Sequence, residues 1–208
     1  MNTSMWDRIE QARAEWNVLE HPFYQRWSAG ELSREDLAEY SGQYRYATEA
    51  IARMSADIAA AAPPAERAGL REHAREEADH IALWDGFVGA VGGTVGDEPT
   101  SETLECVEAW TKADGFGRQL ARLFAVESGQ PDISKTKFEG LAAHYDIPDG
   151  PGNRYFTLHQ EMDVEHAEQG RMLIERHMNE FDEDELVDAA EEAFKANWRL
   201  LDGVSASC

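Results

Sequence analysis

Apolar residues recur at steps of three and four along most of the chain, which is the spacing of one face of an α-helix. In residues 33–61 this face is apolar or aromatic throughout, as at Leu37, Tyr44 and Ile51. Short segments rich in Gly and Pro separate such stretches, and no segment has the alternation of a β-strand. The pattern predicts helices at 5–19, 33–61, 65–90, 101–113, 116–128, 132–145, 153–179 and 182–201.

Local signals support these boundaries. Pro64 and Pro131 suit the first turn of a helix, and Gly92 suits the position after a helix ends. No linker is long enough or simple enough in composition to separate two domains, and no tandem repeat is present. The sequence therefore predicts an all-α bundle in which residues 1–208 form a single domain.

Two of the predicted helices carry ionisable side chains on the face where the others are apolar. Both contain a histidine, an acid four residues later and a second histidine three residues after that: His73, Glu77 and His80, then His159, Asp163 and His166. Positions i, i+4 and i+7 of a helix lie within roughly 60° of one another, so each trio can converge on one point. Glu127 similarly continues the apolar stripe of residues 116–128, and we expect it to be buried.

Buried carboxylates need a compensating positive charge, and Lys and Arg are absent from these inward positions. Divalent metal would supply that charge. Three carboxylates and three imidazoles suit two iron-type ions, whose mixed nitrogen and oxygen ligands leave positions open for dioxygen. The ligands that we predict are Glu77, His80, Glu127, His159, Asp163 and His166.

Some assignments stay open at this point. His73 either binds metal or forms a hydrogen bond to a ligand. Glu76 is adjacent to Glu77, but only Glu77 lies on the inward face. One trio alone is more typical of a solvated helix face, and a single zinc would need only three or four of these ligands. Two trios together with Glu127 favour a pair of metals.

The formal net charge of −22 argues against binding to nucleic acid or to an anionic membrane surface. Cys106 and Cys208 are too few for a disulfide framework, so we expect a reducing, cytoplasmic location. We expect no signal peptide and no membrane span, since no run approaches the roughly 18 apolar residues required. A monomer and a homodimer are both compatible with the sequence.

Four segments carry a family resemblance: "HPFYQRWSAGELSREDL", "EEADHIALWDGF", "AVESGQPDISKTKFEGLAAHY" and "YFTLHQEMDVEHA". Together they resemble the heme-oxygenase-like di-metal oxidases and oxygenases over most of the chain. The resemblance implies a bundle of seven to eight helices that encloses two metals, iron with iron or manganese with iron. It implies dioxygen as co-substrate and an external reductant whose identity is unknown. The ligand positions that it implies are the six listed above.

Within that family the chain resembles the para-aminobenzoate synthases, which make this folate precursor from their own side chains. The resemblance implies that Tyr24 supplies the aromatic ring, that Lys137 supplies the amine and that Tyr155 lies near the metals. These synthases also have a tyrosine just before the metal-binding Glu, where this chain has Val126. Alternatively, Tyr24 is a buried aromatic that closes the bundle and Lys137 is a solvated helix lysine.

Two other functions remain as alternatives. A related oxygenase could act on an external small molecule, through N-oxygenation or oxidative cleavage of an amino or fatty acid. A metal-free relative of thiaminase II or of pyrroloquinoline quinone synthase would leave the acids and histidines unexplained. The thiaminase reaction also needs a cysteine nucleophile, and Cys106 lies in the wrong segment for that role.

Overall fold

The structure is a computed structural model that describes residues 3–96, 98–147 and 149–207, and every regular element within these ranges is helical. The all-α prediction is therefore confirmed. The elements are α1 (Met5–Glu15), η1 (Val18–Glu20), α2 (Pro22–Ala29), α3 (Arg34–Ala61), α4 (Arg67–Val91), α5 (Ser101–Trp110), α6 (Phe116–His144), α7 (Arg154–Arg176), η2 (Met178–Glu180) and α8 (Glu183–Ser207).

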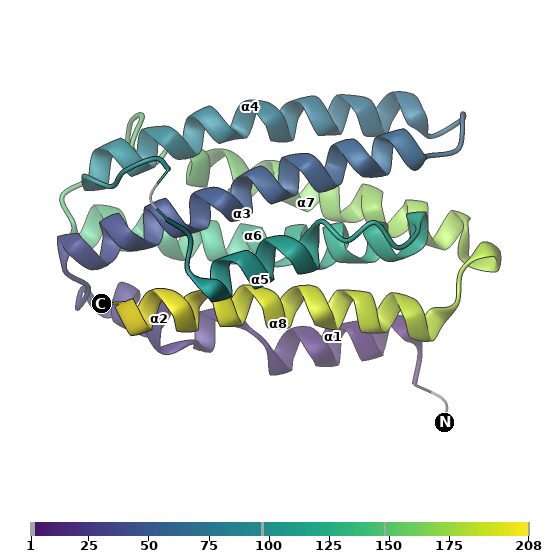
Figure 1. The fold of residues 1–208 in the computed structure, drawn as a ribbon, viewed down its shortest axis with the longest axis horizontal. Coiled ribbons are helices and arrows are strands. Elements are labelled where there is room, and N and C mark those ends of the chain that lie inside the picture. Colours follow the sequence, from purple (N-terminus) through teal and green to yellow (C-terminus); the bar gives the residue numbers. More distant parts are fainter. Residues whose placement is uncertain (1–2, 97, 148, 208) are drawn as a thin grey trace.

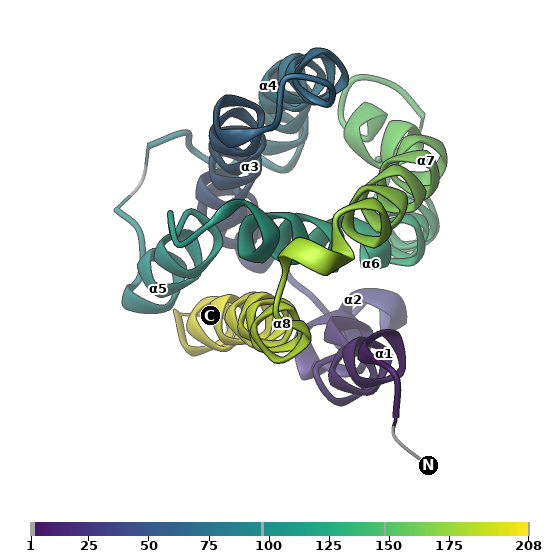
Figure 2. The same ribbon diagram turned by 90° about the vertical axis from the view of Figure 1, so that its right-hand side faces the viewer.

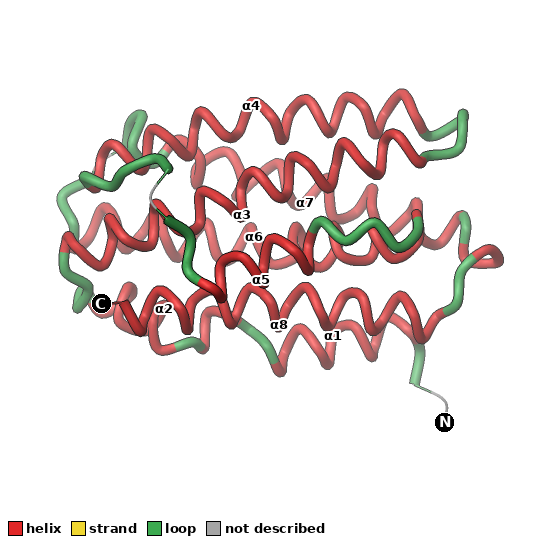
Figure 3. Tube along the Cα trace, in the orientation of Figure 1, coloured by secondary structure: helices red, strands yellow, loops and turns green. Residues whose placement is uncertain are grey.

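Two antiparallel helix pairs form the larger part of the bundle (Figure 1). α3 packs against α4, and α6 packs against α7. The end-on view shows these four helices around a common interior, with α1, α2 and α8 on the far side of α6 (Figure 2). The connecting segments lie mostly at the ends of the long helices (Figure 3). No helix in the described ranges has the length and apolar character needed to cross a membrane.

α2 forms where the sequence pattern indicated only a break. The His21 side chain caps this helix, because its Nδ1 accepts a hydrogen bond from the backbone N–H of Phe23 at 3.0 Å. Pro22 occupies the first helical position, where its missing N–H costs nothing. Gly92 ends α4 in the left-handed conformation, as predicted, with a φ of 79°. Pro64, in contrast, lies in the turn before α4 rather than at its start.

α6 is a single helix of 29 residues, so the prediction of two helices separated at Pro131 is wrong. Proline in a helix interior costs about 3 kcal/mol, because it removes one hydrogen bond and crowds the preceding turn. Here the carbonyl of Glu127 lacks the usual donor four residues later. α6 nevertheless packs along its length against α7 and α8, and this tertiary packing outweighs the local cost. Glu127 and Lys137 consequently lie on the same continuous helix.

Candidate metal centre and buried lysine

α4 and α7 each turn three ionisable side chains into the bundle. All six are buried: His73, Glu77, His80, His159, Asp163 and His166. Because the two helices run antiparallel, their histidines meet in pairs. The rings of His73 and His166 have centroids 4.1 Å apart, and those of His80 and His159 are 4.4 Å apart. The helical spacing seen in the sequence thus produces two layers of facing imidazoles.

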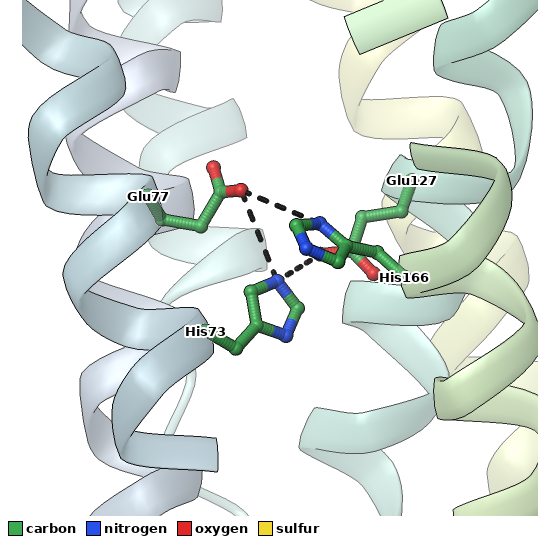
Figure 4. A group of neighbouring side chains, drawn as sticks. All are labelled: His73, Glu77, Glu127 and His166. Atoms are coloured by element: carbon green, nitrogen blue, oxygen red, sulfur yellow. Dashed lines mark ion pairs between the residues drawn. The ribbon is translucent and has the colours of Figure 1, made fainter. Parts of the chain in front are cut away.

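The first layer brings together His73, Glu77, Glu127 and His166, whose candidate ligand atoms lie within 4.8 Å of one another (Figure 4). His73 Nε2 lies 2.7 Å from Glu127 Oε1. Glu77 Oε1 lies 3.8 Å from His73 Nε2 and also 3.8 Å from His166 Nδ1. Side chains from α4, α6 and α7 therefore converge on one point.

The second layer contains Glu77, His80 and His159, again with candidate ligand atoms within 4.8 Å of one another. Glu77 Oε1 lies 3.2 Å from His80 Nδ1. His159 Nδ1 lies 2.7 Å from the carbonyl oxygen of Tyr155, to which it donates when protonated there, leaving Nε2 directed at the site. Glu77 belongs to both groups, and its Oε1 lies near imidazole nitrogens of each.

Seven buried side-chain atoms at this cluster make no hydrogen bond of suitable geometry within the described residues, although two of them, His73 Nε2 and Glu127 Oε1, lie only 2.7 Å apart. The seven atoms are His73 Nε2, Glu77 Oε1, His80 Nδ1, Glu127 Oε1, His159 Nε2, Asp163 Oδ2 and His166 Nδ1. A buried polar atom without a partner costs about 1–3 kcal/mol, so native structures rarely leave such atoms together. Mixed imidazole and carboxylate donors are the ligands that iron and manganese accept. The buried His/Glu cluster thus fits a metal site.

The protonation of the cluster follows from burial and from the contacts between its members. Burial raises the pKa of Glu127 and of Asp163. Burial also lowers the pKa of His159. At His166 burial acts in the same downward direction, but the nearby carboxylates, Asp163 first, outweigh it and raise its pKa to about 9. Among the described residues, the ion pairs of these buried carboxylates all involve histidine.

The structure separates residues that the sequence left together. The Glu77 side chain is 4% exposed, whereas that of Glu76 is 41% exposed and contacts His166 Nε2 at 3.3 Å. His73, whose role the sequence left open, lies within the first group. Asp163 is buried between the two histidine pairs, with Oδ1 3.6 Å from His166 Nδ1, but it belongs to neither group. The inward spacing correctly placed Glu77, His73 and Asp163 inside and Glu76 off the inward face, but it did not show that His73 lies in a group and Asp163 does not.

Lys137 on α6 is fully buried, so the alternative of a solvated lysine is wrong. Its Nζ has no hydrogen-bond partner within the described residues and lies among five aromatic rings. The distances from Nζ to the ring centroids are 4.6 Å for Tyr44, 5.2 Å for Tyr40, 5.2 Å for Trp84, 5.3 Å for Phe156 and 5.7 Å for Tyr24. We call Lys137 and these five rings the lysine pocket.

Two effects act on the charge of Lys137. Each aromatic face favours a cation, by about 0.5–2 kcal/mol. An ammonium group, however, carries three N–H donors, and Nζ makes no hydrogen bond to any residue in the described part of the chain. Burial dominates and lowers the pKa of Lys137 well below its usual 10.5. The amine therefore keeps a free lone pair at a pH where an exposed lysine is protonated.

Packed rings connect the lysine pocket to the candidate metal centre. The hydroxyls of Tyr24 and Tyr40 are hydrogen-bonded at 3.1 Å. Ring centroids are 6.0 Å apart from Tyr40 to Trp84, 4.9 Å from Trp84 to Tyr155 and 3.8 Å from Tyr155 to His159, where the two rings stack. Tyr155, predicted to lie near the metals, thus contacts the second group directly.

Two further positions from the sequence lie away from the cluster. Val126 is buried and lines a small cavity with Trp110 of α5 and Phe194 of α8. A tyrosine there would point away from the candidate ligands. Cys106 is buried in α5 and does not line the cavity beside the cluster. A cysteine nucleophile of the thiaminase type is therefore not supported by this position.

Comparison with known proteins places the sequence among iron-dependent enzymes. Residues 39–198 match the profile of a family described as "Iron-containing redox enzyme". The 4-aminobenzoate synthase of Chlamydia muridarum is 30% identical over 208 residues, which span 94% of this chain and 88% of that protein. The 4-aminobenzoate synthase of Nitrosomonas europaea is also 30% identical, over 95% of this chain and 88% of that protein.

The fold has counterparts among solved structures. A protein of Shewanella denitrificans, described as a domain of unknown function with a heme oxygenase-like fold, aligns over 95% of this chain and 90% of its own. The TM-score is 0.78, at 17% sequence identity. Such a likeness establishes the fold alone. The eight α-helices described above therefore form a heme-oxygenase-like bundle, as the sequence resemblance implied.

Proposed function

Because this chain belongs to the family of iron-containing redox enzymes, we propose that it is a di-metal enzyme that makes 4-aminobenzoate from its own side chains. Tyr24 supplies the aromatic ring and Lys137 supplies the nitrogen. Both residues are buried, far apart in the sequence, and brought together in the lysine pocket. That juxtaposition is the observation that carries the proposal, since a merely structural lysine has no reason to lie unpaired among phenol rings.

The two groups of the cluster would hold two metal ions, iron with iron or manganese with iron. His73, Glu127 and His166 would hold the first ion, and His80 and His159 would hold the second. Glu77, which belongs to both groups, would contribute to both positions, and Asp163 would be available as a further oxygen donor. When bound and reduced by an external donor, such metals supply the electrons that activate dioxygen.

The protein's own residues prepare the reacting groups. Burial leaves Lys137 as a neutral amine, and burial also raises the pKa of Tyr24 well above its usual value, so the phenol stays protonated. Tyr40 holds the Tyr24 hydroxyl through their hydrogen bond. The surrounding rings exclude water, which would compete for reactive species. The ring series through Trp84 and Tyr155 gives an electron a path between Tyr24 and the metal centre.

Near-full-length similarity to two 4-aminobenzoate synthases supports this proposal over other iron-dependent chemistry. The motif positions add to that support. Tyr24, Lys137 and Tyr155 stand where the family pattern places its tyrosines and lysine, and each is buried; Tyr155 stacks on His159 of the cluster. The absence of a tyrosine at Val126 is compatible with this, because that position faces α5 and α8.

A pair of tyrosine variants tests the assignment. Tyr24→Phe and Tyr40→Phe remove opposite ends of the same hydrogen bond, so each should destabilise the fold by about 0.5–1.5 kcal/mol. Only Tyr24→Phe should abolish aminobenzoate formation, with metal content unchanged. Product is measured by mass spectrometry after exposure of the reduced, metal-loaded protein to air.

The same experiment has a clear negative outcome. Continued production by Tyr24→Phe would reject Tyr24 as the ring donor. Mass spectrometry of the spent protein provides an independent check, because the proposed reaction removes the Tyr24 ring and alters Lys137. Peptides that carry both residues intact after product has formed would also reject the proposal.

A second candidate function is oxygenation of an external small molecule. It is favoured by a cavity of about 190 Å³ that reaches His73, Glu127 and His166. That volume is below the roughly 300–1,000 Å³ of typical ligand pockets, so the substrate would have to be small. Several turnovers per chain without any change in the protein's mass would favour this alternative over the self-sacrificing reaction.

A further inference from the structure

The cavity of about 190 Å³ lies at the end of the bundle where α4 begins and α7 ends, the end that faces the viewer in Figure 2. Its floor is formed by three members of the first group, His73, Glu127 and His166. The members found only in the second group, His80 and His159, do not line it. The candidate metal centre is thus approached from one side, through its first position.

The walls of this cavity are mostly apolar. Leu70 comes from α4, Leu120, Leu123 and Phe124 come from α6, and Leu173 comes from α7. Apart from the candidate ligands, the polar residues of the lining are Gln169 and the two charged residues Glu66 and Arg176. Apolar cavities of similar size are known to take up xenon or benzene. A small, uncharged molecule therefore suits most of this lining.

The mouth of the cavity is held by an ion pair. Arg176, near the end of α7, binds Glu66, just before α4, with Nη1 at 2.7 and 2.8 Å from the two carboxylate oxygens. His177 Nε2 lies 3.4 Å from the same carboxylate. Both charges at the mouth are therefore already paired. An anionic substrate would have to break this pair, whereas a neutral molecule of two atoms would not.

Two glycines in helix interiors keep space at this cavity. A Cβ added at Gly69 of α4 would meet no atom within 4 Å, and one at Gly170 of α7 would meet only Phe124 Cβ, at 3.9 Å. Glycine inside a helix costs roughly 1 kcal/mol relative to alanine. An added side chain would therefore cause no steric clash at either position, so crowding does not explain why both residues are glycine. Both glycines line the cavity, where any larger side chain would narrow it.

We infer that this cavity is the route by which dioxygen reaches the candidate metal centre, and that Gly69 and Gly170 keep it open. The inference rests on the proposed function, because dioxygen is the co-substrate of that reaction. It adds a direction: dioxygen arrives at the position formed by His73, Glu127 and His166. The lysine pocket, which the cavity does not reach, receives no dioxygen directly.

Xenon tests the cavity without any metal, because it is apolar, small and detectable by its effect on nearby methyl groups. In metal-free protein, xenon should produce saturable shifts in the methyl NMR signals of Leu123 and Leu173. Gly170→Leu should abolish these shifts by filling the cavity. Gly89→Leu is the matched control. Like Gly170, Gly89 is a glycine within a helix, here α4, and it has open space around it, but it does not line the cavity.

Dioxygen is tested in the reduced, iron-loaded protein by stopped-flow measurement of iron oxidation. Gly170→Leu should slow this reaction at least about tenfold, which corresponds to about 1.4 kcal/mol, while iron content stays unchanged. Gly89→Leu should react like the unmodified chain. If Gly170→Leu fails to fold, as judged by circular dichroism, Gly69→Leu blocks the cavity from the opposite wall.

The outcomes separate this inference from the proposed function. Absence of xenon shifts in the unmodified chain, or an unchanged oxidation rate in a folded, blocked variant, overturns the route. If aminobenzoate still forms in that case, only the route is wrong. If the protein binds xenon but takes up no iron, the cavity exists as described. The failure to bind iron nevertheless overturns the proposed function and the role of the cavity as a route for dioxygen.

Discussion

The candidate metal centre and the lysine pocket both bury nitrogen bases, yet the pKa of His166 in the first and the pKa of Lys137 in the second are shifted in opposite directions. His166 has its pKa raised to about 9 although burial alone would lower it, because Asp163 and other carboxylates are close. Lys137 has no carboxylate near its Nζ, so burial alone acts and lowers its pKa. The comparison shows that close carboxylates can outweigh burial, as they do at His166, whereas burial prevails where such partners are absent, as at Lys137.

The two regions also differ in how the chain builds them. The cluster draws its side chains from α4, α6 and α7, and each trio is local to one helix. The lysine pocket takes its rings from α2, α3, α4 and α7, with a single amine from α6. The candidate metal centre is therefore built from a spacing repeated on two helices, and its carboxylates favour cations. The lysine pocket is assembled from single residues of several helices, and its burial disfavours a charged amine.

The largest expected effect comes from removing the carboxylate shared by both groups. Glu77→Gln keeps the size of the side chain but removes the charge that would hold two metals together. Loss of a residue that only hydrogen-bonds a metal ligand already costs about 10–100-fold in metal affinity, so we expect a loss of at least about 100-fold here. Metal per chain after anaerobic reconstitution, measured by mass spectrometry of the elements, should fall at both positions.

Glu76→Gln is the matched control for that variant. Glu76 is adjacent to Glu77 and has the same chemistry, but its side chain is 41% exposed and its ion pair within the cluster is with His166. We expect its metal content to stay close to that of the unmodified chain. A Glu77→Gln protein that retains two metals, or a Glu76→Gln protein that loses both, would contradict the assignment of Glu77 as the residue that contributes to both positions.

The second prediction concerns the lysine pocket. Lys137→Met preserves the shape of the buried stem and removes the amine, so aminobenzoate formation should stop while metal content remains. Lys135→Met is the control, because Lys135 lies two residues away on the same helix and is exposed. Product formation by Lys137→Met at the normal level would show that the nitrogen comes from elsewhere.

Lys137→Met also tests whether the amine is neutral, through the pH dependence of stability. Since the folded-state pKa lies below the unfolded value of 10.5, the unfolded chain binds the extra proton between these two values. Stability therefore rises with pH across that window, by up to about 1.4 kcal/mol per pH unit. Urea unfolding at several pH values should show this slope reduced in Lys137→Met but retained in Lys135→Met.

The helical spacing was sufficient to predict the all-α class and most of the cluster. His73, Glu77 and His80 share one face of α4 whatever the rest of the fold does, so inward direction follows from sequence alone. Which inward side chains reach a common point depends on the offset between helices. Spacing could not supply that offset. The sequence therefore named Asp163, which lies in neither group, as a ligand and left open the role of His73, which lies in one.

The lysine pocket could not be derived from spacing. Its five rings come from four helices, and nothing in the neighbourhood of Lys137 in the sequence indicates that they meet. The predicted break at Pro131 also hid the fact that Glu127 and Lys137 stand on one helix. Only the family resemblance pointed to Lys137. The reason is general. A buried amine without a charged partner leaves no second residue at a recognisable spacing in the sequence, so a sequence pattern cannot indicate its burial.

The smallest effect, and the finest test of the comparison, is competition between metal and proton. Metal binds neutral imidazole, so His166, with a pKa of about 9, must release a proton at pH 7. His159, whose pKa burial lowers, has none to release. Apparent affinity for manganese should rise by up to tenfold per pH unit for this proton and level off above about 9.

Calorimetric titration in buffers of different ionisation enthalpy counts the released protons directly. At least one proton per chain should appear at pH 7 in the unmodified protein. Lys137→Met should release the same number, because the lysine pocket takes no part in the protonation of the cluster. Manganese binding with no proton release at pH 7 would show that the carboxylates do not hold His166 charged. The contrast between a raised pKa at His166 and a lowered pKa at Lys137 would then be wrong for His166.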